Sequence, residues 1–135
     1  MNLKPGTMLI EVSIRDDEDV ILARHKVRLI AAEMGFGILD QTRVVTAASE
    51  LARNIVVHAG EGKMSAFKME ERPGLMLVFE DKGPGISEME KALTAGYSSV
   101  GSLGLGLRGA RTLTDEFDIR TATAKGTTVT VIQWL

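Results

Sequence analysis

No cysteine occurs in the 135 residues. This absence excludes disulfide bonds, thiolate zinc sites and cysteine nucleophiles, and it fits a reducing compartment. No apolar run approaches the roughly 20 residues that a membrane-spanning helix needs, so we expect a cytoplasmic protein with no membrane partner. The formal net charge is only −2, which argues against a broad nucleic-acid-binding face.

The composition is that of an ordinary folded domain. Hydrophobic residues make up 44% of the chain and charged residues 25%, a balance typical of globular proteins. No internal repeat, low-complexity segment or linker is visible. We therefore expect a single domain over residues 1–135, long enough to bury roughly two thirds of its unfolded surface.

The first half of the chain predicts a strand and two helices. Residues 7–14 alternate between apolar and polar, as in a strand covered on one face. Acidic residues at 16–19 precede a helical pattern that runs to Met34. A second helix is expected from Gln41 to Ala59, capped at its start by Asp40 and closed by Gly60.

The second half predicts two hairpins separated by a short helix and a glycine-rich segment. Strands are expected at 62–70 and 75–80, and again at 117–123 and 127–134. Between the pairs, a short helix is expected at 88–95, and a glycine-lined loop at 101–109 that enters a helix at 110–115. These elements predict a mixed sheet with the helices covering one face.

A carboxylate followed by glycines ends the most apolar predicted strand. Asp81 comes directly after that strand, and Gly83 and Gly85 flank a proline. Such a turn lets the backbone approach a ligand closely, while the carboxylate accepts hydrogen bonds from a planar donor such as the amino group of a purine. The alternative is a simple turn between two elements.

Two further features carry possible chemistry. Glu50 and Asn54 lie four residues apart on the second helix, and so share one face, as either a solvated boundary or a site. The glycines of the 101–109 segment precede a helix, whose free backbone N–H groups attract phosphate; the alternative is a hinge without a ligand. His58 is interpreted as a helix-end residue.

Taken together, these motifs resemble a known domain. Glu50-x-x-x-Asn54, Asp81-x-Gly83-x-Gly85, Gly104/Gly106 and Gly126-Thr127 occur in the order found in the ATP-binding domain of DNA gyrase, histidine kinases and the mismatch-repair MutL proteins, the GHKL superfamily with the Bergerat-type fold. Within it, phrases such as 49–55, 80–86 and the final Trp134-Leu135 look most like the small RsbT-type serine kinases of bacterial partner-switching systems.

The resemblance implies an α/β sandwich with a mixed, mostly antiparallel sheet. It also implies ATP and Mg²⁺ as cofactors and assigns a role to each matching residue. Asp81 would accept a hydrogen bond from the adenine amino group, supported by Thr127. Asn54 would coordinate Mg²⁺, and Glu50 would act as the general base. The glycines would line the nucleotide, at the base for Gly83 and Gly85 and around the phosphates for Gly101, Gly104 and Gly106.

The same resemblance implies a function. It predicts a serine/threonine kinase of the stressosome pathway that phosphorylates STAS-domain antagonist and scaffold proteins and, once released, activates a phosphatase of the PP2C type. Two alternatives stay open. One is an anti-sigma factor kinase that binds a sigma factor, and the other is a non-catalytic module that binds ATP only as a structural ligand.

Overall fold

The computed structural model describes residues 5–83, 103–122 and 125–135. The expected short helix at 88–95 and the site residues Gly85 and Gly101 lie outside these ranges, so the predictions made for them stay predictions.

A five-stranded sheet forms one layer of the described structure. Its strands are β1 (Pro5–Ile14), β2 (Gly62–Met69), β3 (Gly74–Asp81), β4 (Glu116–Ala122) and β5 (Gly126–Trp134), in the spatial order β1-β2-β3-β5-β4. The two predicted hairpins, β2 with β3 and β4 with β5, are confirmed. All four pairings are antiparallel, so the sheet is not the mixed one that we expected.

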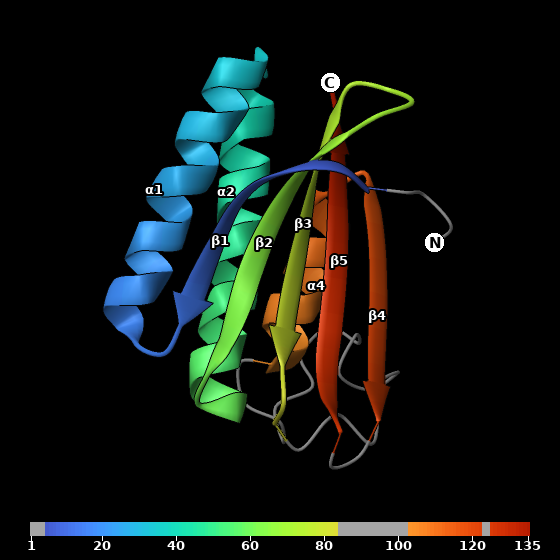
Figure 1. The fold of residues 1–135 in the computed structure, drawn as a ribbon. Coiled ribbons are helices and arrows are strands. Elements are labelled where there is room, and N and C mark those ends of the chain that lie inside the picture. Colours follow the sequence, from blue (N-terminus) through green and yellow to red (C-terminus); the bar gives the residue numbers. More distant parts are fainter. Residues whose placement is uncertain (1–4, 84–102, 123–124) are drawn as a thin grey trace.

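Helices cover one face of this sheet, which confirms the predicted fold class (Figure 1). They are α1 (Asp17–Met34), α2 (Ile38–Asn54) and α4 (Leu103–Leu113), and α2 packs against both of the others. Alternate strand residues, among them Leu75, Leu77 and Phe79, join the helices in the main core. None of the described helices is long and apolar enough to span a membrane.

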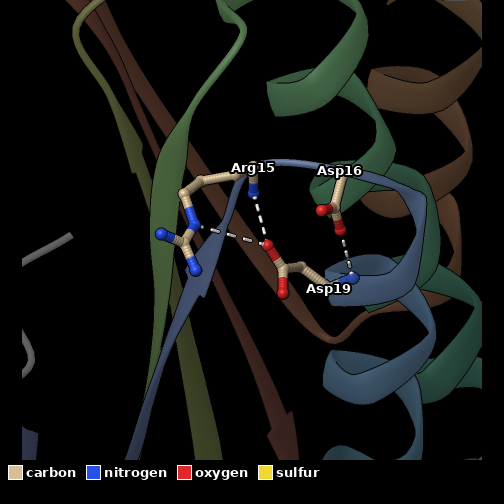
Figure 2. A network of polar contacts seen from close by, with 3 residues as sticks. All are labelled: Arg15, Asp16 and Asp19. Carbon is tan, nitrogen blue, oxygen red and sulfur yellow. Dashed lines mark hydrogen bonds and ion pairs between the residues drawn. The ribbon is translucent and has the colours of Figure 1, made fainter.

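The acidic start of α1 is a capping network (Figure 2). Asp16 has an extended backbone, and its Oδ1 accepts the backbone N–H of Asp19 at 3.0 Å. Asp19 reaches back, so that its Oδ2 accepts the backbone N–H of Arg15 at 2.9 Å and lies 3.7 Å from Arg15 Nε. Two backbone donors at the helix entrance are thus satisfied by carboxylates, which also suit the positive end of the helix dipole.

The start of α2 differs from the prediction. The helix begins at Ile38 with Gly37 at the N-cap position, and Asp40 lies inside its first turn. The Asp40 carboxylate is used in a tertiary contact instead, because its Oδ1 accepts a hydrogen bond from Gln133 Nε2 of β5 at 3.2 Å. A long-range partner has therefore replaced the local cap that the sequence suggested.

The end of α2 widens into a different kind of helix. Residues Ile55–Ala59 form a π-helical turn, η1, and the N–H of Gly60 donates to the carbonyl of Ile55 at 2.9 Å. The predicted stop at Gly60 is confirmed, but the last turn before it is not α-helical. Single π turns of this kind are frequent at functional sites.

The predicted glycine loop at 101–109 is in large part a helix. α4 begins at Leu103, so Gly104 and Gly106 lie in its first turn and Gly109 in its middle. Leu107 and Ala110, three residues apart, are fully or nearly fully buried in the main core. Burial of this face against α2 outweighs the low helix propensity of glycine, which is about 1 kcal/mol per residue.

Candidate functional site

One end of the molecule brings the predicted site elements together. The last turns of α2 with η1, the end of β3, the start of β5, the end of β4 and the first turn of α4 all lie at this end, drawn lowest in Figure 1. η1 contacts both β2 and β3, and α2 packs on α4. Every predicted site residue within the described ranges belongs to these elements, apart from Gly83, which lies two residues beyond the end of β3.

Glu50 and Asn54 occupy the last two turns of α2. Glu50 is partly exposed, as a residue that meets a visiting group must be, whereas Asn54 is only 9% exposed. Asn54 Nδ2 is buried and has no hydrogen-bond partner among the described residues. Buried polar atoms are nearly always bonded in folded proteins, so this amide N–H marks a position where a ligand that brings an acceptor can complete the hydrogen bond.

The donor set also bears on how a metal ion would be held. In the part of the chain that the structure describes, no three His, Cys, Asp or Glu side chains lie together as a metal cage. A single carboxamide oxygen suits Mg²⁺, because that ion keeps most of its waters and is commonly bound through one or two protein oxygens plus phosphates. Asn54 therefore fits an ion that arrives with the nucleotide.

Asp81 forms a tight turn with Gly83. Asp81 Oδ1 accepts the backbone N–H of Gly83 at 2.9 Å, while its Oδ2 accepts no hydrogen bond from a described residue. A Cβ added to Gly83 would lie 2.7 Å from the Cβ of Ala59, so the turn is pressed directly against η1. The glycine is thus required by packing against the helix, and the carboxylate keeps one oxygen for a ligand.

Antiparallel register places Asp81 in a row that crosses four strands. Asp81 pairs with Gly62 of β2 on one side and with Thr127 of β5 on the other, and Thr127 pairs with Thr121 of β4. Directly paired residues point to the same face of a sheet. Phe79 and Val129, two residues along from Asp81 and Thr127, belong to the main core, so this row faces the helices.

His58 lies in η1 near the same carboxylate. Its Nε2 is buried and has no hydrogen-bond partner in the part of the chain that the structure describes. Burial lowers the pKa of His58 below its ordinary value of 6.5, and the negative charge of Asp81 acts in the opposite direction. The prediction that His58 is a helix-end residue is confirmed, because it lies in the last turn of η1, and the structure adds its position near Asp81.

Sequence reasoning missed three residues that shape this end of the molecule. Gly62 and Thr121 are found only from the strand register, which an exact pairing of each predicted hairpin could have supplied. Ala59 contacts Gly83 because η1 ends beside the turn that follows β3. No pattern in the local sequence predicts that η1 is a π-helical turn.

A model of the histidine kinase-like ATPase domain matches residues 14–133 of the chain. The chain belongs to the histidine kinase-like ATPase domain family. For this family, ATP is the expected nucleotide, and the cluster of Glu50, Asn54, Asp81 and Thr127 at one end of the sheet is the candidate ATP site.

Relatives narrow the assignment. The chain is 42% identical to the serine/threonine-protein kinase RsbT of Bacillus subtilis, over 92% of this chain and 95% of that protein. It is 29% identical to an anti-sigma F factor of Clostridium kluyveri, over 90% of this chain and 89% of the relative. An anti-sigma F factor of Caldanaerobacter subterraneus is 27% identical over 84% of this chain and 83% of its own length.

A solved structure agrees with the fold. The structure of the RsbU and RsbW domains of Rv1364c from Mycobacterium tuberculosis superposes with a TM-score of 0.65 at 21% identity, covering 94% of this chain. The chain spans 33% of that longer protein.

The family match and the 42% identity to RsbT together identify the class of enzyme. Within the histidine kinase-like ATPase family, this chain is a serine/threonine-protein kinase of the kind to which RsbT belongs.

Proposed function

We propose that this kinase transfers the γ-phosphoryl group of ATP to a serine or threonine of a STAS-domain antagonist or scaffold protein in a bacterial stressosome pathway. The observation that carries the proposal is the grouping of Glu50 and Asn54 on α2 with the Asp81–Thr127 strand pair at one end of the molecule. The similarity to RsbT supports the choice of a hydroxyl on a protein as the acceptor.

The chemical step needs little covalent participation from the enzyme. The substrate Oγ forms a bond to the γ-phosphorus, and the bond from that phosphorus to the oxygen bridging it to the β-phosphorus breaks, so that ADP leaves. The hydroxyl proton passes to the carboxylate of Glu50. General-base assistance of this kind contributes about 10²–10⁴-fold, and positioning contributes much of the rest.

Binding of the nucleotide is divided among three elements. Asp81 accepts the adenine amino group through the oxygen that Gly83 leaves free. Asn54 holds Mg²⁺, which when bound would neutralise phosphate charge. The first turn of α4, with Gly104 and Gly106, presents helix N-terminal N–H groups to the phosphates, in place of the preceding loop that the sequence suggested. The roles of Gly85 and Gly101 stay predictions.

The proposal includes partners on both sides of the reaction. STAS-domain proteins are the substrates, and after phosphorylating them the released kinase activates a phosphatase of the PP2C type. The similarity to RsbT and to anti-sigma F factors supports a partner-switching role. A cytoplasmic location remains part of this proposal.

Phosphoryl transfer tests the proposal directly. We expect purified kinase, Mg²⁺ and γ-labelled ATP to label a STAS-domain protein on serine or threonine. Glu50→Gln keeps the shape of the side chain but removes the base, so it should bind ATP with unchanged affinity and transfer phosphate about 10²–10⁴-fold more slowly.

Glu33→Gln, at the exposed end of α1, is the matched control and should transfer phosphate at the wild-type rate. Full activity of Glu50→Gln would remove Glu50 from the reaction. Absence of labelling by the wild-type protein across a panel of STAS-domain substrates would overturn the proposed activity.

The anti-sigma relatives support a second candidate, an anti-sigma factor kinase, because they cover most of this chain. Immobilised kinase loaded with ATP distinguishes the two. Capture of a purified sigma subunit would favour the anti-sigma role, whereas capture of a STAS-domain protein alone would favour the switch kinase.

A further inference from the structure

A pair of threonine hydroxyls adjoins the carboxylate of Asp81. Thr127 Oγ1 lies 2.9 Å from Thr121 Oγ1, and Thr121 Oγ1 donates to the carbonyl of Gly126 at 3.3 Å. Register places Thr127 directly beside Asp81 and places Thr121 directly beside Thr127. The three side chains therefore form one polar row on the helix-covered face.

In the contact between the two hydroxyls either oxygen could be the donor, and the nearby Gly126 carbonyl favours Thr127 as the donor. A backbone carbonyl can only accept, and a threonine hydroxyl has one proton to donate. When Thr121 gives its proton to the Gly126 carbonyl, the 2.9 Å contact is made with the proton of Thr127. The lone pairs of Thr127 Oγ1 are then available to accept a hydrogen bond from a ligand.

The backbone around this row is held in place. Gly126 has a φ of 90°, and a Cβ at this position would overlap the carbonyl oxygen of Asp81 and lie 2.8 Å from the Cα of Lys82. The start of β5 is thus packed directly on the end of β3. Small shifts that would separate Thr127 from Asp81 are opposed by this contact, so the acceptors keep their spacing.

We infer that Thr121 is a positioning residue for nucleotide specificity, because it holds the Thr127 hydroxyl as an acceptor beside the acceptor Asp81. Two neighbouring acceptors match the exocyclic amino group of adenine and oppose the oxygen that guanine carries at the same place. A buried polar mismatch of this kind commonly discriminates strongly. This inference rests on the proposed ATP-binding function and extends it to a residue of β4.

Thr121→Val tests the inference, since valine keeps the side-chain shape and removes the hydroxyl. Thr127 then loses its acceptor and is free to donate. We expect ATP affinity to fall about three- to tenfold, with GTP affinity unchanged or higher, so that the ATP-to-GTP affinity ratio falls. In Thr121→Val, KM for ATP should rise while kcat stays unchanged. Thr121→Ser should restore the wild-type affinity ratio.

Thr130→Val is the matched control. Thr130 also lies on β5, but it pairs with Val78 on the face away from the helices, so its substitution should leave the affinity ratio unchanged. Thermal unfolding of each variant shows whether the fold is retained, and Thr121→Ser supplies the answer if Thr121→Val does not fold, because serine must keep the wild-type ratio.

The outcomes separate this inference from the proposed function. If the wild-type protein binds no ATP, the proposed function fails. If it binds ATP and Asp81→Asn weakens binding, while Thr121→Val keeps the wild-type ratio, only the role of Thr121 is overturned. A loss of ratio in Thr121→Val that serine fails to restore would likewise contradict positioning by the hydroxyl.

Discussion

Asn54 combines near-complete burial with an amide nitrogen that has no hydrogen-bond partner within residues 5–83, 103–122 and 125–135. Such a group is unfavourable for folding unless a ligand uses it, so the residue reads as functional rather than stabilising. If the side-chain oxygen of Asn54 holds Mg²⁺, the ATP affinity of Asn54→Ala with Mg²⁺ present should fall to the value measured when a chelator removes the ion. Urea unfolding of this variant should show no large loss of stability.

Ser49→Ala, five residues before Asn54 on α2, is the control for Asn54→Ala and should keep the wild-type response to Mg²⁺. Calorimetric titration of ATP in Mg²⁺ and in chelator measures the effect. Survival of the Mg²⁺ dependence in Asn54→Ala would assign the ion to other ligands.

His58 should make stability depend on pH. Because burial lowers its pKa in the folded state, the unfolded state binds the proton more readily, and stability rises with pH. The destabilisation is absent above about pH 6.5, grows as pH falls through that value, and is complete below the folded pKa.

Asp81 on β3 is the charged group that acts on His58, and its negative charge opposes the effect of burial on the pKa. Urea unfolding above and below pH 6.5 should show a smaller acid-side loss in His58→Gln, whereas His25→Gln, at an exposed position of α1, should behave as wild type. Equal losses in both variants would exclude His58 as the source.

At the scale of elements, the sequence predicted the helices, the hairpins and the strand that ends at Asp81, because each has a strong periodicity or a clear turn. The sequence-based predictions were wrong where tertiary contacts determine the local structure. Asp40 bonds Gln133 instead of capping α2, and the glycines at 104 and 106 are helical because Leu107 and Ala110 are buried. The π turn of η1 depends on its fit against β3, which local sequence does not encode.

The tight contact between the start of β5 and the end of β3 predicts that alanine at Gly126 destabilises the protein more than alanine at Gly35. Gly35 and Gly126 both have positive φ, 94° and 90°, but only Gly126 is crowded, since nothing lies within 4 Å of a Cβ at Gly35. Alanine in the left-handed region costs about 1–2 kcal/mol. We expect Gly35→Ala to lose about that much stability, and Gly126→Ala to lose more and to weaken ATP binding as well.

Urea unfolding and ATP titration of both variants check this expectation. Equal stability losses, with full ATP affinity in Gly126→Ala, would show that the β5 turn does not support Asp81.

At the scale of the whole molecule, the candidate site depends on elements far apart in sequence meeting at one end of the sheet. The order of the motifs singled out Asp81 and Thr127, and in the structure these two residues are strand partners. The roles that the resemblance implies for them stay predictions. The motif order could not place Gly62 and Thr121 in the same row of paired strand residues as Asp81, because that placement requires the register of three strand pairings. A single domain over residues 1–135 stays a prediction.

Thermal unfolding of the wild-type protein and of Asp81→Asn, with and without Mg²⁺ and ATP, tests the ATP site most directly. Asparagine can still accept the N–H of Gly83, so the variant should fold, but it offers the adenine amino group a weaker acceptor. We expect ATP at a hundred times its Kd to stabilise the wild-type protein by about 2.7 kcal/mol and Asp81→Asn by clearly less. An equal shift in both proteins, or no shift in the wild type at millimolar ATP, would contradict a nucleotide site at the end of β3.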